Sequence, residues 1–166
     1  MYSFWRQSTS PKVPVIRTFE DLRQHKNWVC YDRDGDGLSS VTRQWEDGTD
    51  PQAWDTYENA HQYFRDHYPS ALIGVGFMLT PEFGVTLMEV HDCLDDGMLN
   101  PVAKELVEQF DTSYIEIINH KTGLRIWVQD LLHEPISFED EEEREEYLAE
   151  HPARLVKVSN DEWGKY

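Results

Sequence analysis

Residues 71–90 read ALIGVGFMLTPEFGVTLMEV, and the class of fold follows from this stretch. The segment Thr80-Pro81-Glu82 interrupts the apolar run, which ends in acidic residues, so the run makes a poor membrane-spanning helix. Each half has the length of a strand and the β-branched and aromatic residues typical of a buried one. We therefore expect two core strands, 71–79 and 83–90, and no membrane contact.

Helical and strand-like patterns alternate on both sides of these two strands. Capping residues such as Thr18, Asp50 and Ser137 predict where helices begin, because their side chains accept hydrogen bonds from the first turn. The predicted helices cover 19–26, 51–67, 101–110 and 139–150, and the predicted strands cover 27–31, 38–45, 71–79, 83–90, 113–118, 124–128 and 154–159. This order predicts an α/β (α+β) fold with a mixed, largely antiparallel sheet and flanking helices. We expect residues 1–17 to form an N-terminal arm and residues 18–166 to form a single domain.

The chain carries 15 basic and 32 acidic residues, which gives a formal net charge of −17. Such a charge repels phosphate, so binding to nucleic acid through electrostatics alone is disfavoured. Adaptation to a halophilic host explains the charge, because molar salt screens a dense acidic surface. A DNA mimic, or an inhibitor of a DNA-binding protein, would be acidic for a different reason. The acids are spread along the whole chain, and this favours the halophilic explanation.

Cys30 and Cys93 are the only cysteines. Neither belongs to a CxxC motif and both lie in apolar surroundings, a pattern that predicts buried, reduced thiols of an intracellular protein. The first residues, MYSFWRQSTSPK, lack the apolar segment of a secretory signal. We therefore expect a cytoplasmic protein.

The order of several short segments is similar to that of a known family. The segments are NWVCY, GTDPQAWDTYENAHQYF, ALIGVGFMLT, FGVTLMEVHDCLDDG, DTSYIEI, TGLRIWV and RLVKVSNDEW. In this order and spacing they resemble the N-terminal primase-polymerase (bifunctional DNA primase/polymerase) domain of the archaeo-eukaryotic primase superfamily. That domain occurs in replication proteins of viruses and plasmids, including those of haloarchaea. The resemblance spans about residues 18–164.

The resemblance implies a degenerate active site. The family holds divalent metal ions with an acidic pair, D-x-D, whose carboxylates share one face of a strand. The family's G-[IV]-D-L-D corresponds to residues 84–88 here, which places Thr86 and Met88 at the two acidic positions. Neither side chain suits Mg²⁺, so we expect no catalytic residue and no cofactor. Mg²⁺ or Mn²⁺ would be needed only if activity were retained.

The family's second motif, S-x-S-G-x-G-x-H, corresponds to the segment that ends at residue 125. Its histidine, which contacts the phosphates of the incoming nucleotide in the family, is Arg125 here. Arginine also binds phosphate, so nucleotide binding is not lost by this exchange. A basic-aromatic patch for a nucleotide or single-stranded DNA would consist of His120, Lys121, Arg125 and Trp127. An ordinary hairpin tip is the alternative, and we expect the loss of the Arg125 side chain to leave folding nearly unchanged.

Three residues at the end of the second apolar strand offer a relocated metal site, namely Glu89, His91 and Asp92. Glu89 and His91 share a face through the two-residue period of a strand, and this face is opposite to that of Thr86 and Met88. We therefore expect them to point away from the cleft that the family uses. A cluster at the surface is the simpler interpretation.

These observations favour a catalytically inactive primase-polymerase-like domain with a binding or accessory role in DNA replication of a halophilic archaeon, virus or plasmid. An inactive copy can keep the fold because packing and metal chemistry use different residues. The partner would be a replication protein, single-stranded DNA or a nucleotide. Two alternatives are an active, divalent-metal-dependent nucleotidyltransferase (a DNA primase/polymerase) that uses rearranged acids such as Glu89 and Asp92, and an acidic DNA mimic or inhibitor protein.

Overall fold

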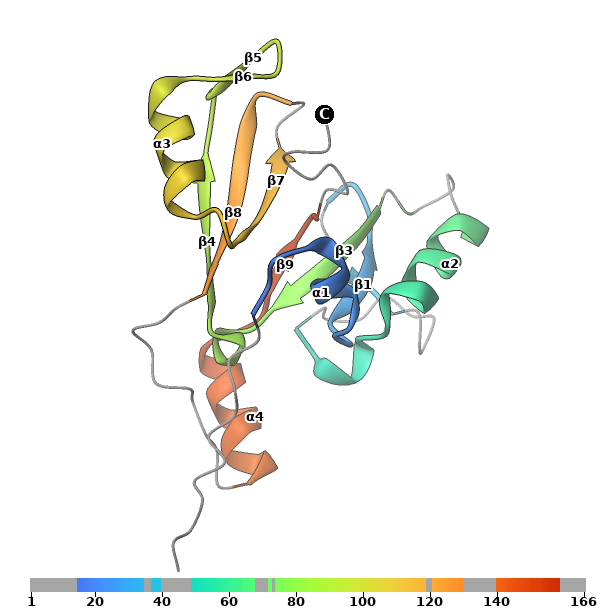
Figure 1. Cartoon of the computed structure of the whole chain (residues 1–166). Helices are drawn as coiled ribbons and strands as arrows, with labels where there is room; N and C mark the ends of the chain where they lie inside the picture. The colour runs from blue at the N-terminus through green and yellow to red at the C-terminus, as the bar shows by residue number, and fades with distance from the viewer. Residues whose placement is uncertain are drawn as a thin grey trace, which may run out of the picture.

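The chain folds into two main antiparallel sheets that pack against each other, with helices around them (Figure 1). The computed structural model describes residues 15–34, 37–39, 49–67, 72, 74–118, 121–129 and 140–158. The predicted α+β class and its largely antiparallel pairing are confirmed. Among these residues, no helix is long and apolar enough to cross a membrane.

The first sheet has the strand order β2-β1-β3-β9, and every neighbouring pair is antiparallel. Its strands are β1 (Trp28–Tyr31), β2 (Gly37–Leu38), β3 (Gly74–Leu79) and β9 (Arg154–Val156). The predicted hairpin of strands 27–31 and 38–45 is present where the chain is described, with Cys30 opposite Leu38. Residues 40–48, most of its second strand, lie outside the described residues.

The second sheet has the strand order β4-β8-β7. Its strands are β4 (Val85–Val90), β7 (Tyr114–Ile118) and β8 (Gly123–Gln129), and the predicted hairpin of strands 113–118 and 124–128 is confirmed as β7-β8. A short hairpin that the sequence pattern did not predict follows β4, formed by β5 (Leu94–Asp95) and β6 (Met98–Leu99). Alternation along the three main strands gives this sheet two distinct faces.

A tight turn sends the chain from the first sheet to the second. After β3, the 3₁₀ turn η2 (Pro81–Phe83) begins with proline, whose fixed backbone angle suits this position. Gly84 then takes a left-handed conformation, with φ 66° and ψ 29°, which glycine adopts without steric cost. The two apolar strands of residues 71–90 therefore belong to different sheets, and β4 pairs with β8 instead of β3.

Two clusters of apolar side chains cover the two faces of the second sheet. The central core lies between the two sheets, where the Phe77 ring meets Trp28, Phe83 and Trp127 in edge-to-face contacts, with centroids 5.2, 5.3 and 5.8 Å away. The outer core lies between the second sheet and helix α3 (Pro101–Gln109), and it contains Ile126. Both faces of the second sheet are thus covered. This explains why strands β7 and β8 are rich in apolar residues at successive positions.

The helix expected over residues 51–67 is broken near its start. Residues 51–53 form a 3₁₀ turn, η1 (Pro51–Ala53), and the α-helix α2 (Tyr57–His67) begins only at Tyr57. Between them, Asp55 exchanges two backbone hydrogen bonds with Trp28 of β1, of 3.0 and 3.1 Å. A local helical pattern therefore gives way to pairing with a distant strand. The short helix α1 (Phe19–Arg23) begins at Thr18 with the predicted capping box.

Two details of the later helices differ from the prediction. In α3, the apolar spacing of the helix predicts an inward-facing Val102, but this residue is 64% exposed, while Ala103 is buried. Helix α4 (Glu141–Glu150) begins after Asp140, whose carboxylate accepts from the Glu143 amide, and not after Ser137, which lies outside the described residues. Asp140 competes well as a cap because its charge also interacts favourably with the helix dipole.

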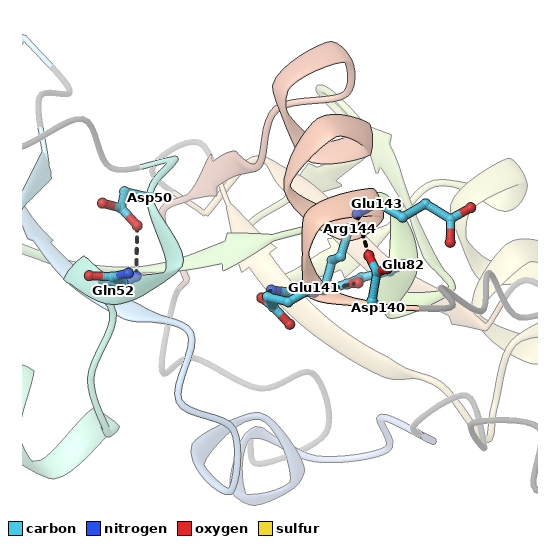
Figure 2. A network of polar contacts seen from close by, with 7 residues as sticks. All are labelled: Asp50, Gln52, Glu82, Asp140, Glu141, Glu143 and Arg144. Atoms are coloured by element: carbon cyan, nitrogen blue, oxygen red, sulfur yellow. Dashed lines mark hydrogen bonds and ion pairs between the residues drawn. The ribbon is translucent and has the colours of Figure 1, made fainter.

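One arginine attaches the acidic helix α4 to the rest of the molecule. Figure 2 shows Arg144 of α4 reaching Glu82 of the turn η2, with the guanidinium Nε 3.1 and 3.0 Å from the two carboxylate oxygens. The same guanidinium donates to Glu141 at 2.9 Å. The hydrogen bonds to both carboxylate oxygens fix α4 beside the turn that joins β3 to β4, as Figure 1 also shows.

Removing the ring of Phe77 should destabilise the whole fold, because this ring contacts aromatic side chains of both sheets. We expect Phe77→Ala to lower the free energy of unfolding by about 3–5 kcal/mol, measured by urea denaturation. Val102→Ala, at an exposed position, should change it by less than about 0.5 kcal/mol. Equal effects of the two variants would contradict the central position of Phe77.

Candidate functional site

A row of three charged residues crosses the second sheet. The strand register places Arg125 of β8 directly opposite Glu89 of β4 on one side and Glu116 of β7 on the other. Residues that lie opposite one another in a sheet project to the same face, so the three side chains meet there. This is the face of the second sheet that is turned toward the first sheet, since Leu87 and Trp127, two residues farther along, pack in the central core.

Arg125 bonds to both carboxylates and to the other sheet. Its Nε donates to Oε1 of Glu89 at 2.8 Å, and its Nη1 donates to Oε1 of Glu116 at 3.0 Å. The same Nη1 lies 3.0 Å from the carbonyl oxygen of Lys157, which follows β9. Figure 1 shows β9 as the edge strand of the first sheet on the side of the second sheet. The guanidinium therefore lies at the junction of the two sheets.

Glu116 is the most deeply buried charge of this network. Its exposed fraction is 0%, against side-chain exposures of 12% for Arg125 and 26% for Glu89. A carboxylate at such a position is strongly destabilising unless a positive charge and hydrogen bonds compensate it. Arg125 supplies the charge, and the indole Nε1 of Trp127 donates a further hydrogen bond to Oε1 of Glu116 at 2.9 Å.

The side chain of Arg125 therefore belongs to a buried network, and for this reason we now expect its loss to destabilise the fold. The sequence pattern did not single out Glu116. The one available signal was an acidic residue inside the apolar strand Tyr-Ile-Glu-Ile-Ile of residues 114–118, at a position that alternation assigns to a buried face. Its partner could not be named without the register between β7 and β8.

Thr86 and Met88 lie on the other face of the second sheet. In β4 they alternate with Glu89, and Met88 lies opposite Ile126 and packs in the outer core against α3. Thr86 is exposed. A cleft lined by Thr86, Met88 and Arg125 therefore does not form, because the sheet separates Arg125 from the other two. The physical reason is the two-residue period of the strand, in which residues 86 and 89 cannot share a face.

Of the three residues considered for a relocated metal site, only Glu89 is part of the network. His91 is 59% exposed and its Nε2 lies 3.8 Å from Oε2 of Glu89, while Asp92 is exposed in a turn with φ 50°. Glu89 lies on the face opposite to Thr86 and Met88, as the strand period predicted, and on that face it forms an ion pair with Arg125. Within the described part of the chain, no three His, Cys, Asp or Glu side chains are placed to hold a metal ion together.

The basic-aromatic patch does not form as predicted. Trp127 is only 1% exposed, because the face it shares with Arg125 is covered by the first sheet. Lys121 is exposed in the turn before β8, with φ 72°, and His120 lies outside the described residues. The two-residue period of a strand correctly places Arg125 and Trp127 on the same face of β8, but the sequence could not show that a second sheet covers this face.

Comparison with known proteins does not assign the chain to a family. The chain matches no protein-family model and no curated protein. The resemblance to primase-polymerase domains therefore rests on the segments quoted above.

Removing the Arg125 charge should destabilise the protein strongly, because the buried carboxylate of Glu116 would be left uncompensated. We expect Arg125→Met to lower the free energy of unfolding by about 3 kcal/mol, measured by urea denaturation. Arg125→Met/Glu116→Gln should recover part of this loss, since the second substitution removes the buried charge. The matched control is Arg154→Met, at an exposed position of β9, with a change of less than about 0.5 kcal/mol. A mild effect of Arg125→Met would mean that Glu116 is not charged in the fold.

Proposed function

We propose that this protein is a catalytically inactive primase-polymerase-like domain with a binding or accessory role in DNA replication. The single observation that carries the loss of catalysis is the position of the Arg125 guanidinium between Glu89 and Glu116. A nucleotidyltransferase of this type needs carboxylates that bind divalent metal ions. Here the guanidinium, which does not lose its proton in proteins, forms ion pairs with both carboxylates and occupies the place between them.

The strand register supports a revised correspondence with the family. The metal-binding pair and the phosphate-binding residue must face the same substrate, so they belong on one face of the sheet. The residues of β4 on the Arg125 side are Val85, Leu87 and Glu89, with His91 two residues beyond Glu89. The family's D-x-D would then correspond to Glu89-x-His91 instead of Thr86-x-Met88. An imidazole suits Zn²⁺ better than Mg²⁺, so the second position would still fail as a magnesium ligand.

The retained role in this proposal is binding. The partner would be a replication protein, single-stranded DNA or a nucleotide. The setting would be the cytoplasm of a halophilic archaeon, and the protein would belong to the archaeon or to one of its viruses or plasmids. The charge of −17 supports a setting at high salt, where repulsion between the protein and phosphate is screened. The exposed acids of α4 contribute to this charge without lying at the network around Arg125.

The test is template-directed primer synthesis and extension with Mg²⁺ or Mn²⁺ in molar KCl. The natural protein should show no product, because its acids are bound to Arg125. Nucleotide incorporation above background by the natural protein would contradict the proposal.

A pair of variants tests the revised correspondence in the same assay. His91→Asp/Arg125→His, combined with Glu116→Gln to remove the buried charge that Arg125 compensates, restores the acid and the histidine of the family on the Glu89 face, and detectable synthesis is expected only from this variant. Thr86→Asp/Met88→Asp places the same acidic pair on the α3 face and serves as the matched control, with no product expected. Both variants are first checked for folding by circular dichroism. Activity of the control variant alone would show that the original correspondence was right.

A further inference from the structure

A cavity of 190 Å³ lies between helix α2 and the first sheet, and its lining does not include Arg125, Glu89 or Glu116. Rings form most of its wall, and they belong to α1, β1 and α2. The ring-bearing residues are Phe19, Trp28, Tyr31, Tyr57, His61 and Phe64. Figure 1 shows α2 alongside β1 and β3, on the side of the molecule away from α3. We call this space the aromatic cavity.

The absence of a side chain at Gly74 leaves room for the Tyr31 ring, which forms part of the wall of the aromatic cavity. Gly74 of β3 lies opposite Tyr31 of β1, and a Cβ atom at residue 74 would be 2.5 Å from the Tyr31 hydroxyl oxygen. The Tyr31 ring therefore lies across the place that any other side chain would occupy. Burial raises the pKa of Tyr31, so its hydroxyl stays neutral and can both donate and accept a hydrogen bond.

The charge around the aromatic cavity differs from that of the whole protein. None of the nine described residues that line it is acidic, in a chain with a formal charge of −17. The ammonium of Lys157 lies 5.0 Å from the centroid of the Tyr31 ring, and its neighbour Val158 lines the cavity. A cation is therefore present beside the cavity, within reach of a negatively charged group that emerges from it.

The lining combines stacking surfaces with polar atoms. His61 stacks on Tyr57 with ring planes 15° apart and centroids 5.3 Å apart. The imidazole and the hydroxyls of the two tyrosines can hydrogen-bond to the edge of a planar ligand. Ligands of drug size occupy pockets of about 300–1,000 Å³. The aromatic cavity is smaller, so it suits a single heterocyclic ring system.

We propose that the aromatic cavity binds the base of a nucleoside or mononucleotide, with the phosphate of a nucleotide beside Lys157. Aromatic side chains stack on a base without depending on its sequence, and hydrogen-bonding groups at the edge fix its orientation. A single nucleotide carries few charges, whereas a DNA strand would meet the full repulsion of this acidic protein. The inference specifies the ligand of the binding role proposed above, and it rests on that role for the choice of nucleotides.

The experiment is isothermal titration of the whole protein with AMP, adenosine and ribose 5-phosphate, in molar KCl and again at low salt. We expect AMP and adenosine to bind and ribose 5-phosphate not to bind. His61→Ala should weaken both AMP and adenosine about tenfold, because it removes a stacking and hydrogen-bonding group. Lys157→Ala should weaken AMP alone, and more at low salt, where its charge is less screened.

The same helix provides a matched control. His67 also stacks on a tyrosine of α2, Tyr63, with centroids 4.0 Å apart, but neither residue lines the aromatic cavity. His67→Ala should therefore leave the affinity for AMP unchanged. Thermal unfolding of each variant, measured without ligand, shows that it is folded before its affinity is compared.

Four results would overturn the inference. The first two are that the natural protein binds neither AMP nor adenosine, or that it binds ribose 5-phosphate as tightly as AMP. The other two are that His61→Ala and His67→Ala have equal effects on the affinity for AMP, or that a single-stranded oligonucleotide binds more tightly than AMP. Failure here is distinguishable from failure of the proposed function. If the natural protein makes no product in primer synthesis and does not bind AMP, only this inference is contradicted. If it shows polymerase activity, the proposed function is contradicted, and the titration still tests whether the aromatic cavity binds a nucleotide.

Discussion

Glu116 carries a carboxylate into a part of the protein that water does not reach, and Arg125 makes this burial tolerable. The guanidinium also bonds to Glu89 of the neighbouring strand and to the backbone carbonyl of Lys157 beside the first sheet. One side chain thus links all three strands of the second sheet to the edge of the first. A buried charge can remain only if its partner is held in place, so the register of β4, β8 and β7 and the approach of β9 depend on each other.

In the proposed function, the same interaction accounts for a loss of metal chemistry without a loss of the fold. A divalent ion and a guanidinium are both cations that satisfy buried or half-buried carboxylates. A metal ion leaves open coordination positions for substrate oxygens, whereas the planar guanidinium donates its hydrogen bonds to groups of the protein itself. In our proposal, the network is a structural replacement for a catalytic centre, and the binding role moves to the aromatic cavity.

Much of the fold followed from local patterns. The apolar halves of residues 71–90, the capping box at Thr18 and the hairpin of β7 and β8 were all predicted, because each depends on residues close together in the chain. The predictions failed where a distant strand intervened. Asp55 pairs with Trp28 instead of continuing a helix, and Trp127 is buried because the first sheet lies over it. The sequence also could not show that Thr86 and Met88 lie on the face opposite to Arg125, since only the strand register shows which residues face it.

The sequence by itself determined the α+β class, most of the elements and the pairing of Arg125 with Trp127 on one face, since hydrophobic period and capping chemistry act over a few residues. Only the tertiary structure decided that β3 and β4 belong to different sheets, that Glu116 and Glu89 are the partners of Arg125, and that rings from α1, β1 and α2 enclose a cavity. These features join residues far apart in the chain. Burial and charge compensation among such residues are properties of the packed molecule, and no local stretch of sequence contains them.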